Sequence, residues 1–167
     1  MTVGEFWNEQ KFSYLATYSF NREPKLAEAM QQAIQELKAA RFMQKAAAQR
    51  KIERLKNRSD KLTDESGKLH VTAIQLAEIH SQSVVAQQLG AIFTQASKQD
   101  VYAMFWPIYR DAFVFYNEKR AVVRVLNICF ECNYMATDTG LHVEADAATY
   151  QRLSELIVQL GHTIESY

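Results

Sequence analysis

Residues 111–132, DAFVFYNEKRAVVRVLNICFEC, decide the fold class of this chain of 167 residues. The segments 111–116 and 121–132 are rich in aromatic and β-branched side chains, which fit the pleated surface of a sheet. Between them, Asn117–Arg120 has the polar composition of a tight connection. The stretch therefore predicts two antiparallel strands joined by a turn.

The sequence after this pair predicts a short third strand and a terminal helix. A turn at Ala136–Gly140 precedes the strand Leu141–Glu144. Asp146 suits the N-cap of a helix, because its carboxylate can accept a hydrogen bond from a free amide of the first turn, and Gly161 suits the helix end. The apolar stripe of this helix consists of Tyr150, Leu153, Leu156, Ile157 and Leu160. We expect a small antiparallel sheet, of two or three strands, with the C-terminal helix packed on it.

The first twenty residues carry two different patterns. Thr2 and Glu5 have the spacing of a capping box, which predicts a short helix near residues 3–9. Apolar side chains then alternate with polar or small ones, as in a half-buried strand, at Phe12, Tyr14, Ala16, Tyr18 and Phe20. We expect a strand in this second segment.

The middle of the chain predicts a long N-terminal helical hairpin. Pro24 favours a first helical turn, and an apolar stripe among good helix formers predicts a helix over about 25–57. Turn-forming residues follow at 57–67. Apolar residues at helical spacing then predict a second helix over about 69–97, which returns antiparallel along the first.

These elements describe an α+β fold in one compact domain, with a mainly helical region, 1–99, and a ββ(β)α unit, 100–167. Hydrophobic residues make up 48% of the chain, but no apolar run is long enough to cross a bilayer. The first residues lack the basic-then-apolar pattern of a secretion signal, and the two cysteines are too close in sequence to form a secreted disulfide framework. We expect a cytoplasmic protein without a membrane partner.

The basic residues are concentrated in the first half of the chain. Nine of the nineteen Lys and Arg residues lie between Lys38 and Lys61, where the acids are only Glu53 and Asp60. Such polarity affects the choice of partner and the association rate more than the fold. We therefore expect this basic helix to bind an acidic or mixed-charge protein partner through Arg41, Lys45, Arg50, Lys51, Arg54 and Arg58.

Nucleic acid is the alternative partner of the basic helix 38–61. Its cations can neutralise phosphates and release counterions, which gives affinity without sequence specificity. The segment has a single aromatic residue, Phe42, and lacks a set of side chains that could stack on bases. This absence favours the protein partner. Self-association through the Ala-rich helical face is a further option.

Trp106 and Tyr109 flank Pro107 in an aromatic segment and have two interpretations. Trp and Tyr bury large areas at interfaces, so the two residues can form an exposed patch that anchors a partner. They can also pack in the core between the sheet and the C-terminal helix, which is the more common use of aromatic residues in a small domain.

Cys129 and Cys132 form a C-x-x-C pair at the end of an apolar strand. Residues three apart on a flat strand point to opposite faces, so a disulfide or a shared metal requires a bend between them. Apolar neighbours disfavour the thiolate that zinc binding and thiol exchange need, and we expect both cysteines to be reduced, metal-free and structural. The alternative is a redox or zinc site, with Cys129, Cys132, His142 and His162 as the zinc ligands.

The sequence contains no motif of an enzyme or cofactor site. It lacks a phosphate-binding glycine loop, G-x-S-x-G and H-E-x-x-H. His70 and His80 have no evident carboxylate and nucleophile beside them, and we expect both at the surface. The sequence therefore favours a non-catalytic interaction protein of a regulatory, adaptor, inhibitor or immunity type, without a cofactor.

Overall fold

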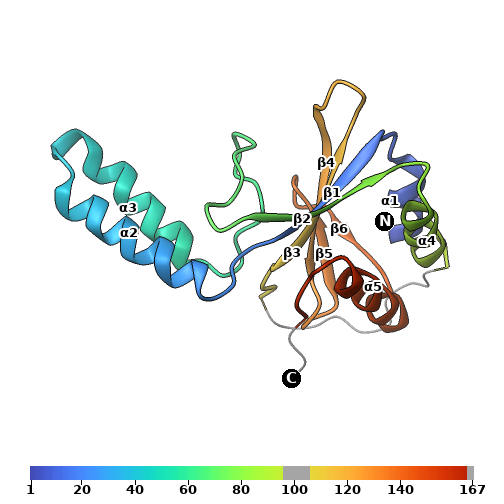
Figure 1. Cartoon of the computed structure of the whole chain (residues 1–167). Coiled ribbons are helices and arrows are strands. Elements are labelled where there is room, and N and C mark those ends of the chain that lie inside the picture. The colour runs from blue at the N-terminus through green and yellow to red at the C-terminus, as the bar shows by residue number, and fades with distance from the viewer. Residues whose placement is uncertain (96–105, 165–167) are drawn as a thin grey trace.

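The computed structural model describes residues 1–95 and 106–164, in which five helices accompany a six-stranded antiparallel sheet (Figure 1). The predicted α+β class is confirmed. The strand order across the sheet is β2-β1-β3-β4-β5-β6. Among the helices of the described ranges, none is long and apolar enough to span a membrane. The elements in chain order are α1 Val3–Glu9, β1 Tyr14–Ser19, α2 Lys25–Ala39, α3 Phe42–Lys56, β2 Ile74–His80, α4 Val84–Thr94, β3 Asp111–Tyr116, β4 Val122–Cys129, β5 Tyr134–Thr137, β6 His142–Val143 and α5 Ala147–Gln159.

The local sequence signals correctly predicted the elements near both ends of the chain. The backbone N–H of Glu5 donates to Thr2 Oγ1 over 3.2 Å, and the N–H of Thr2 donates back to the Glu5 carboxylate over 2.7 Å, so the capping box of α1 is complete. The strand expected after α1 is β1. At the other end, Asp146 caps α5 by accepting a 2.7 Å hydrogen bond from the N–H of Thr149. Gly161 follows α5 with a φ of +94°, a conformation that strains other residues.

The sheet is larger than the two or three strands expected. β3 and β4 are the predicted pair, and β6 lies inside the predicted third strand. The predicted strand 121–132 ends early, because the chain bends through residues 130–133 and Asn133 has a positive φ of 47°. It returns as β5, which the sequence prediction missed and which places Tyr134 opposite Cys129.

The predicted helix over about 69–97 is wrong in its first half. Residues 74–80 instead form β2, which pairs with β1 and buries Ile79 opposite Leu15. α4 begins only after Ser83, whose hydroxyl accepts a 3.2 Å hydrogen bond from an amide of the first turn. Pairing overrides the helical spacing of the apolar residues, because it satisfies the backbone groups that β1 would otherwise expose at the sheet edge. The last residues of that predicted helix lie outside the described ranges.

The predicted helix over about 25–57 is two helices, α2 and α3, separated at Ala40–Arg41. Both of these residues have extended backbone conformations, with ψ values of 131° and 162°. The break lets α3 run back along α2, so that Leu26, Ala33 and Leu55 form a small shared core. Burial of these side chains favours the folded-back pair over one long exposed helix. A helical hairpin therefore exists, but its two helices are α2 and α3.

α1, α4 and α5 cover one face of the sheet (Figure 1). Alternate residues of the central strands, such as Leu15, Phe113 and Leu126, pack toward these helices. The helices contribute the buried side chains of Phe6, Leu89, Phe93, Leu153 and Ile157. This core lies on one face of the sheet, and a different segment of the chain covers the opposite face.

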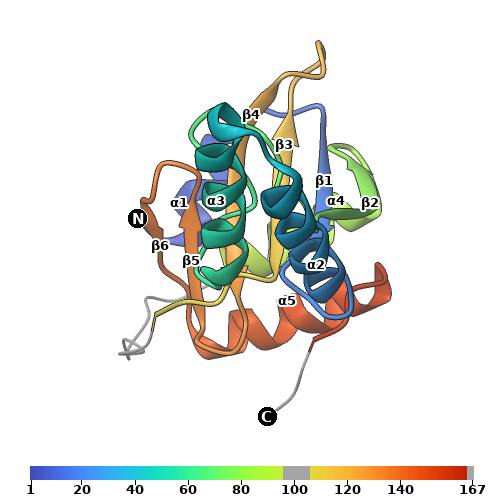
Figure 2. The ribbon, with the colours of Figure 1, turned by 90° about the vertical axis from the view of Figure 1, so that its left-hand side faces the viewer.

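The segment 57–73, which connects α3 to β2 and is called the strap below, crosses the opposite face of the sheet. Leu62 of the strap is fully buried there, in a cluster with Ala16 of β1 and Val114 of β3. α2 and α3 stand on this side of the molecule and project from it as an arm, residues 25–56 (Figures 1 and 2). The strap therefore connects the arm to the sheet.

Candidate functional site

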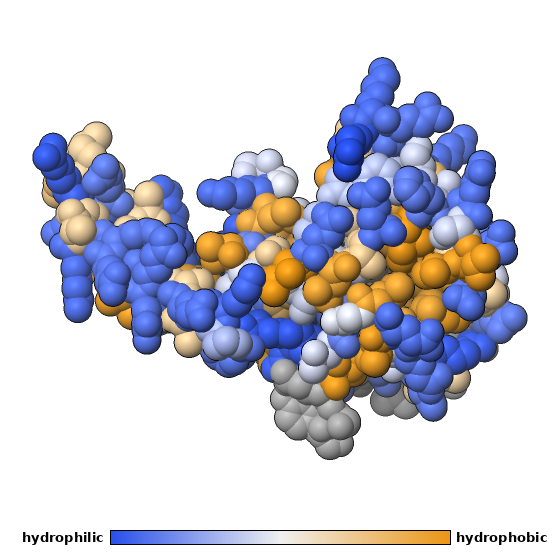
Figure 3. Space-filling view, viewed as in Figure 1, coloured by the Kyte–Doolittle hydropathy of each residue, from blue (hydrophilic) through white to orange (hydrophobic). Residues whose placement is uncertain are grey.

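The arm carries the predicted basic residues on a mostly hydrophilic surface (Figure 3). Arg41, Lys45 and Arg50 are exposed and form no ion pair with another residue of the described ranges. Lys38, at the end of α2, is exposed in the same way. The structure thus brings these cations together on a projecting element, where a partner can reach them from several sides.

The other three predicted residues, Lys51, Arg54 and Arg58, have partners within the chain. Lys51 Nζ lies 2.7 Å from a carboxylate oxygen of Glu36 on α2. Arg54 contacts two carboxylates of the strap, at 2.9 Å to Asp60 and 3.1 Å to Asp64. Arg58 lies 3.8 Å from Glu23. These pairs stabilise the arm, and of the six predicted residues they leave Arg41, Lys45 and Arg50 available to a partner.

Asp64 is well suited to hold Arg54. A hydrogen bond from the Ser66 hydroxyl and one from the backbone of Lys68 lower the pKa of the Asp64 carboxyl, and the charge of Arg54 lowers it further. The carboxylate therefore stays ionised at neutral pH and holds the base of the arm against the strap.

The tip of the arm exposes two large apolar side chains. Phe42 and Met43 begin α3, and each is 88% exposed. Behind the tip, the groove between α2 and α3 has a volume of about 430 Å³. It is lined by Ala39, Ala40, Ala47 and Ala48, with Glu36, Gln44 and Lys51 at its sides. Exposed apolar side chains next to an open groove are typical of an interaction surface. The sequence reasoning missed Met43 and treated Phe42 only as an isolated aromatic residue, because it did not foresee the helix break beside them.

Trp106 and Tyr109 do not share one exposed patch. Trp106 is 87% exposed, whereas Tyr109 is 4% exposed and packs in the core beneath the strap. Burial, with a smaller contribution from Tyr134, raises the pKa of Tyr109. The inclusion of Tyr109 among the partner-binding residues is therefore corrected, because a partner cannot reach its ring.

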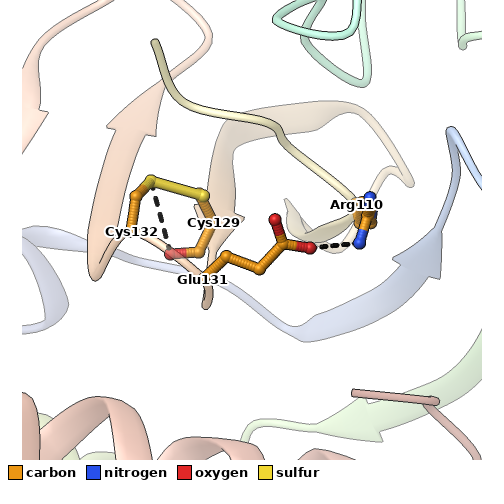
Figure 4. Close-up of a disulfide and its surroundings, with 4 residues drawn as sticks. All are labelled: Arg110, Cys129, Glu131 and Cys132. Atoms are coloured by element: carbon orange, nitrogen blue, oxygen red, sulfur yellow. Dashed lines mark hydrogen bonds and ion pairs between the residues drawn. A yellow bond between two sulfur atoms is a disulfide. The ribbon is translucent and has the colours of Figure 1, made fainter. Parts of the chain in front are cut away.

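Cys129 and Cys132 are joined by a disulfide, so the expectation of two reduced thiols is wrong for this structure (Figure 4). The bend after β4 brings their Cα atoms to 5.6 Å, within the usual range for a disulfide. Cys129 is 2% exposed and packs in the core beneath the strap, whereas Cys132 is half-buried. Residues 129–133 are called the cysteine turn below.

The cysteine turn is attached to its surroundings through Glu131 and Phe130. The Glu131 carboxylate pairs with Arg110 and points away from the sulfur atoms (Figure 4). The Phe130 ring contacts Tyr150 of α5 edge to face, with the ring centroids 6.4 Å apart. A cavity of about 310 Å³ lies between the turn and α5, lined on the α5 side by Tyr150 and Ser154. Burial raises the pKa of Tyr150, which keeps its hydroxyl protonated.

The alternative zinc set of Cys129, Cys132, His142 and His162 is not assembled. Within residues 1–95 and 106–164, no three His, Cys, Asp or Glu side chains are grouped so that they could hold a metal ion. The His142 ring instead stacks on Tyr134, with the centroids 4.5 Å apart. His162 is held by Asp111, and its Nδ1 lies 2.6 Å from Asp111 Oδ1.

Asp111, His162 and Arg22 form a buried polar cluster that the sequence reasoning missed. The second carboxylate oxygen of Asp111 lies 2.7 Å from a terminal nitrogen of Arg22, and the Ser19 hydroxyl accepts a 2.9 Å hydrogen bond from Arg22 Nε. His162 Nε2 is buried and has no hydrogen-bond partner among the described residues, so no nucleophile is poised against this histidine there. The cluster joins the ends of β1, β3 and α5, and nothing in the local sequence signals it.

One of the two histidines expected at the surface is buried. His80 is exposed, but His70, a residue of the strap, is buried with its Nδ1 2.8 Å from the hydroxyl oxygen of Thr72. Burial, and to a smaller degree the charge of Arg54, lowers the pKa of His70 to about 4. His70 is therefore neutral near pH 7 and belongs to the core.

Two surfaces of the molecule are candidates for function. The arm presents unpaired cations beside exposed apolar side chains, and the cysteine turn presents a disulfide at the end of the sheet. Comparison with protein-family models, with curated proteins and with solved structures found no match to this chain.

Proposed function

We propose that this chain is a non-catalytic, cytoplasmic interaction protein of a regulatory, adaptor or inhibitor type, and that its arm binds an acidic protein partner. The observation that carries the proposal is the composition of the arm tip. In sequence, Arg41 precedes the exposed side chains of Phe42 and Met43, and Lys45 and Arg50 follow them. None of these three cations forms an ion pair in the described structure.

The charge of the tip supports an acidic partner. Residues 37–52 contain no Asp or Glu, so the cations there add up without internal compensation along the chain. A field of one sign on a projecting element raises the rate of encounter with an oppositely charged surface, and salt screens that effect over about 10 Å at 0.1 M. Lys51 pairs with Glu36 between the two helices of the arm, and Arg54 pairs with Asp60 and Asp64 of the strap, so these two cations are already engaged within the chain.

The apolar side chains of the tip supply a short-range contribution. Burying a Phe or Met side chain in a partner removes its apolar surface from water, which is worth roughly 1.5–3 kcal/mol for each residue. The alanine-lined groove behind the tip can accept an apolar side chain of the partner in return. Charge would then govern how fast the complex forms, and Phe42 and Met43 would govern how slowly it dissociates.

Site-specific photo-crosslinking in the native cell tests this proposal. p-Benzoylphenylalanine at position 43 should crosslink to one protein with an acidic surface, and the same probe at Val158, exposed on α5, should not. The triple variant Arg41→Glu, Lys45→Glu, Arg50→Glu should lose the crosslink while keeping its circular dichroism spectrum. Unchanged crosslinking by this variant would contradict the role of charge.

The same experiment separates the alternatives. A crosslink from position 43 to RNA or DNA would indicate the nucleic-acid function, for which heparin should compete. A crosslink to a second copy of this chain would indicate self-association through the alanine-lined groove. Either result would overturn the acidic protein partner.

A further inference from the structure

The two cysteines of the disulfide differ in burial. Cys129 is buried in the core beneath the strap, whereas Cys132 is half-buried beside the exposed Glu131. We propose that Cys129–Cys132 is a reversible thiol–disulfide site that exchanges with dithiols of the thioredoxin class, through attack on Cys132 Sγ. This site is separate from the arm and does not depend on the arm's function.

The fold holds the two cysteines together without the help of the bond. β4 and β5 are paired by backbone hydrogen bonds from Leu126 and Thr137 down to Cys129 and Tyr134. The disulfide links residues only three apart, so it closes a small loop that the hairpin already closes. Reduction therefore leaves the thiols near each other and lets the bond form again.

The charge around the turn suits attack by an anion. The attacking group in thiol–disulfide exchange is a thiolate, which a free carboxylate beside the sulfur atoms would repel. Glu131 is the only acid of the cysteine turn, and Arg110 both neutralises it and holds its carboxylate away from the disulfide (Figure 4). Arg110 is therefore a positioning residue for this exchange.

The exchange is a two-electron transfer from the dithiol to the disulfide. One thiolate of the dithiol attacks Cys132 Sγ, the bond between the two cysteine sulfurs breaks, and Cys129 leaves as a thiolate that takes up a proton. The second thiolate of the dithiol then attacks the dithiol sulfur that is bonded to Cys132 Sγ in the mixed disulfide. This step releases Cys132 as a thiol after protonation and leaves the dithiol oxidised to its disulfide.

Reduction of the folded, oxidised chain by dithiothreitol tests the accessibility of the bond. Free thiols are counted with a maleimide at increasing urea concentrations below the unfolding transition. We expect a rate that is independent of urea, because Cys132 is attacked in the native state. A rate that rises in parallel with the unfolding rate would overturn the proposal, as would two free thiols that persist after treatment with diamide.

Single-cysteine variants test which sulfur atom is attacked. The Cys129→Ser variant retains Cys132, and we expect its thiol to react with iodoacetamide at least about tenfold faster than the Cys129 thiol of the Cys132→Ser variant. Equal rates, or a faster Cys129, would overturn the assignment of Cys132.

Variants that change the charge at positions 110 and 131 test the role of Arg110 through the rate of disulfide reduction. Arg110→Gln should slow reduction at low salt by about two- to fourfold, because it frees the charge of Glu131, and added salt should restore the rate. Glu131→Gln in the same chain should restore it at low salt. Should Arg110→Gln fail to fold, Glu131→Gln alone still decides. This variant leaves the charge of Arg110 uncompensated, so reduction at low salt should be about two- to fourfold faster, and added salt should remove the gain. An unchanged rate at low salt would show that the charges of this pair do not act on the disulfide.

Discussion

The side-chain carbonyl oxygen of Asn127 accepts a 2.8 Å hydrogen bond from the backbone N–H of Leu62. Asn127 lies on β4 and Leu62 on the strap, and both residues are completely buried. The amide nitrogen of Asn127 also donates to the carbonyl oxygen of Ala136 on β5 over 3.3 Å. A single polar side chain therefore ties the strap, and through it the arm, to two strands of the sheet.

Asn127→Ala should destabilise the protein by about 2–3 kcal/mol. The substitution leaves the N–H of Leu62 buried without its acceptor, which costs about 1–3 kcal/mol, and it also removes the side-chain hydrogen bond to the carbonyl of Ala136. Urea unfolding at pH 7 measures the change. Gln87→Ala, at an exposed position of α4, is the control and should stay within about 0.5 kcal/mol of the wild type. An Asn127→Ala protein as stable as this control would contradict the role of the strap contact.

The stability of the protein should decrease as the pH falls from 6.5 to about 4, because the pKa of His70 drops from 6.5 in the unfolded chain to about 4 in the folded protein. Over this range the unfolded chain binds a proton that the buried ring does not. The free energy of unfolding should decrease by about 1.4 kcal/mol per pH unit, up to about 3 kcal/mol, and stay constant above pH 6.5.

Urea unfolding between pH 7.5 and 4.5 checks the contribution of His70. Because carboxylates also titrate at low pH, the informative quantity is the difference between the wild type and His70→Gln, which lacks the titrating ring. His80→Gln, at an exposed position, should keep the wild-type profile. Parallel profiles of the wild type and His70→Gln would show that burial of His70 does not shift its titration.

Asp111→Asn should cost about 2–4 kcal/mol, because it removes the buried carboxylate charge that lies 2.7 Å from Arg22 and weakens the hydrogen bond to the buried His162. A matched control is Asp138→Asn, which removes the partner of Arg124 from a pair that is partly exposed and 3.5 Å long. That change should cost less than about 1 kcal/mol. Chemical unfolding of the two variants side by side should separate them, and equal losses would argue against a buried cluster.

The exposed cations of the arm should contribute little to stability. The triple variant Arg41→Glu, Lys45→Glu, Arg50→Glu should unfold within about 1 kcal/mol of the wild type, because these residues form no ion pair in the described structure. Arg54→Ala, in contrast, should cost about 1 kcal/mol, because Arg54 joins the arm to two carboxylates of the strap. Thermal unfolding provides the measurement. A larger loss in the triple variant than in Arg54→Ala would mean that the tip is part of the folded core.

Elements whose signals lie in neighbouring residues could be predicted from the amino-acid sequence. The capping box at Thr2 and Glu5 and the cap at Asp146 each depend on hydrogen bonds within a few positions of the chain, so α1 and α5 could be predicted from local pattern. The alternation around Tyr18 is also a pattern of neighbouring residues and predicted β1, although the strand itself pairs with the distant β2 and β3.

Features that join residues distant in sequence could not be predicted in this way, because they depend on how the chain folds in three dimensions. β2 became a strand because β1 lies beside it, and α2 and α3 separated because Leu26 and Leu55 bury each other when the chain folds back. The cluster of Asp111 with His162 joins residues 51 positions apart. The same holds for the candidate site. Composition identified its basic residues, but internal ion pairs and the helix break determine which cations and apolar side chains remain exposed. Burial and pairing depend on neighbours in space rather than in sequence.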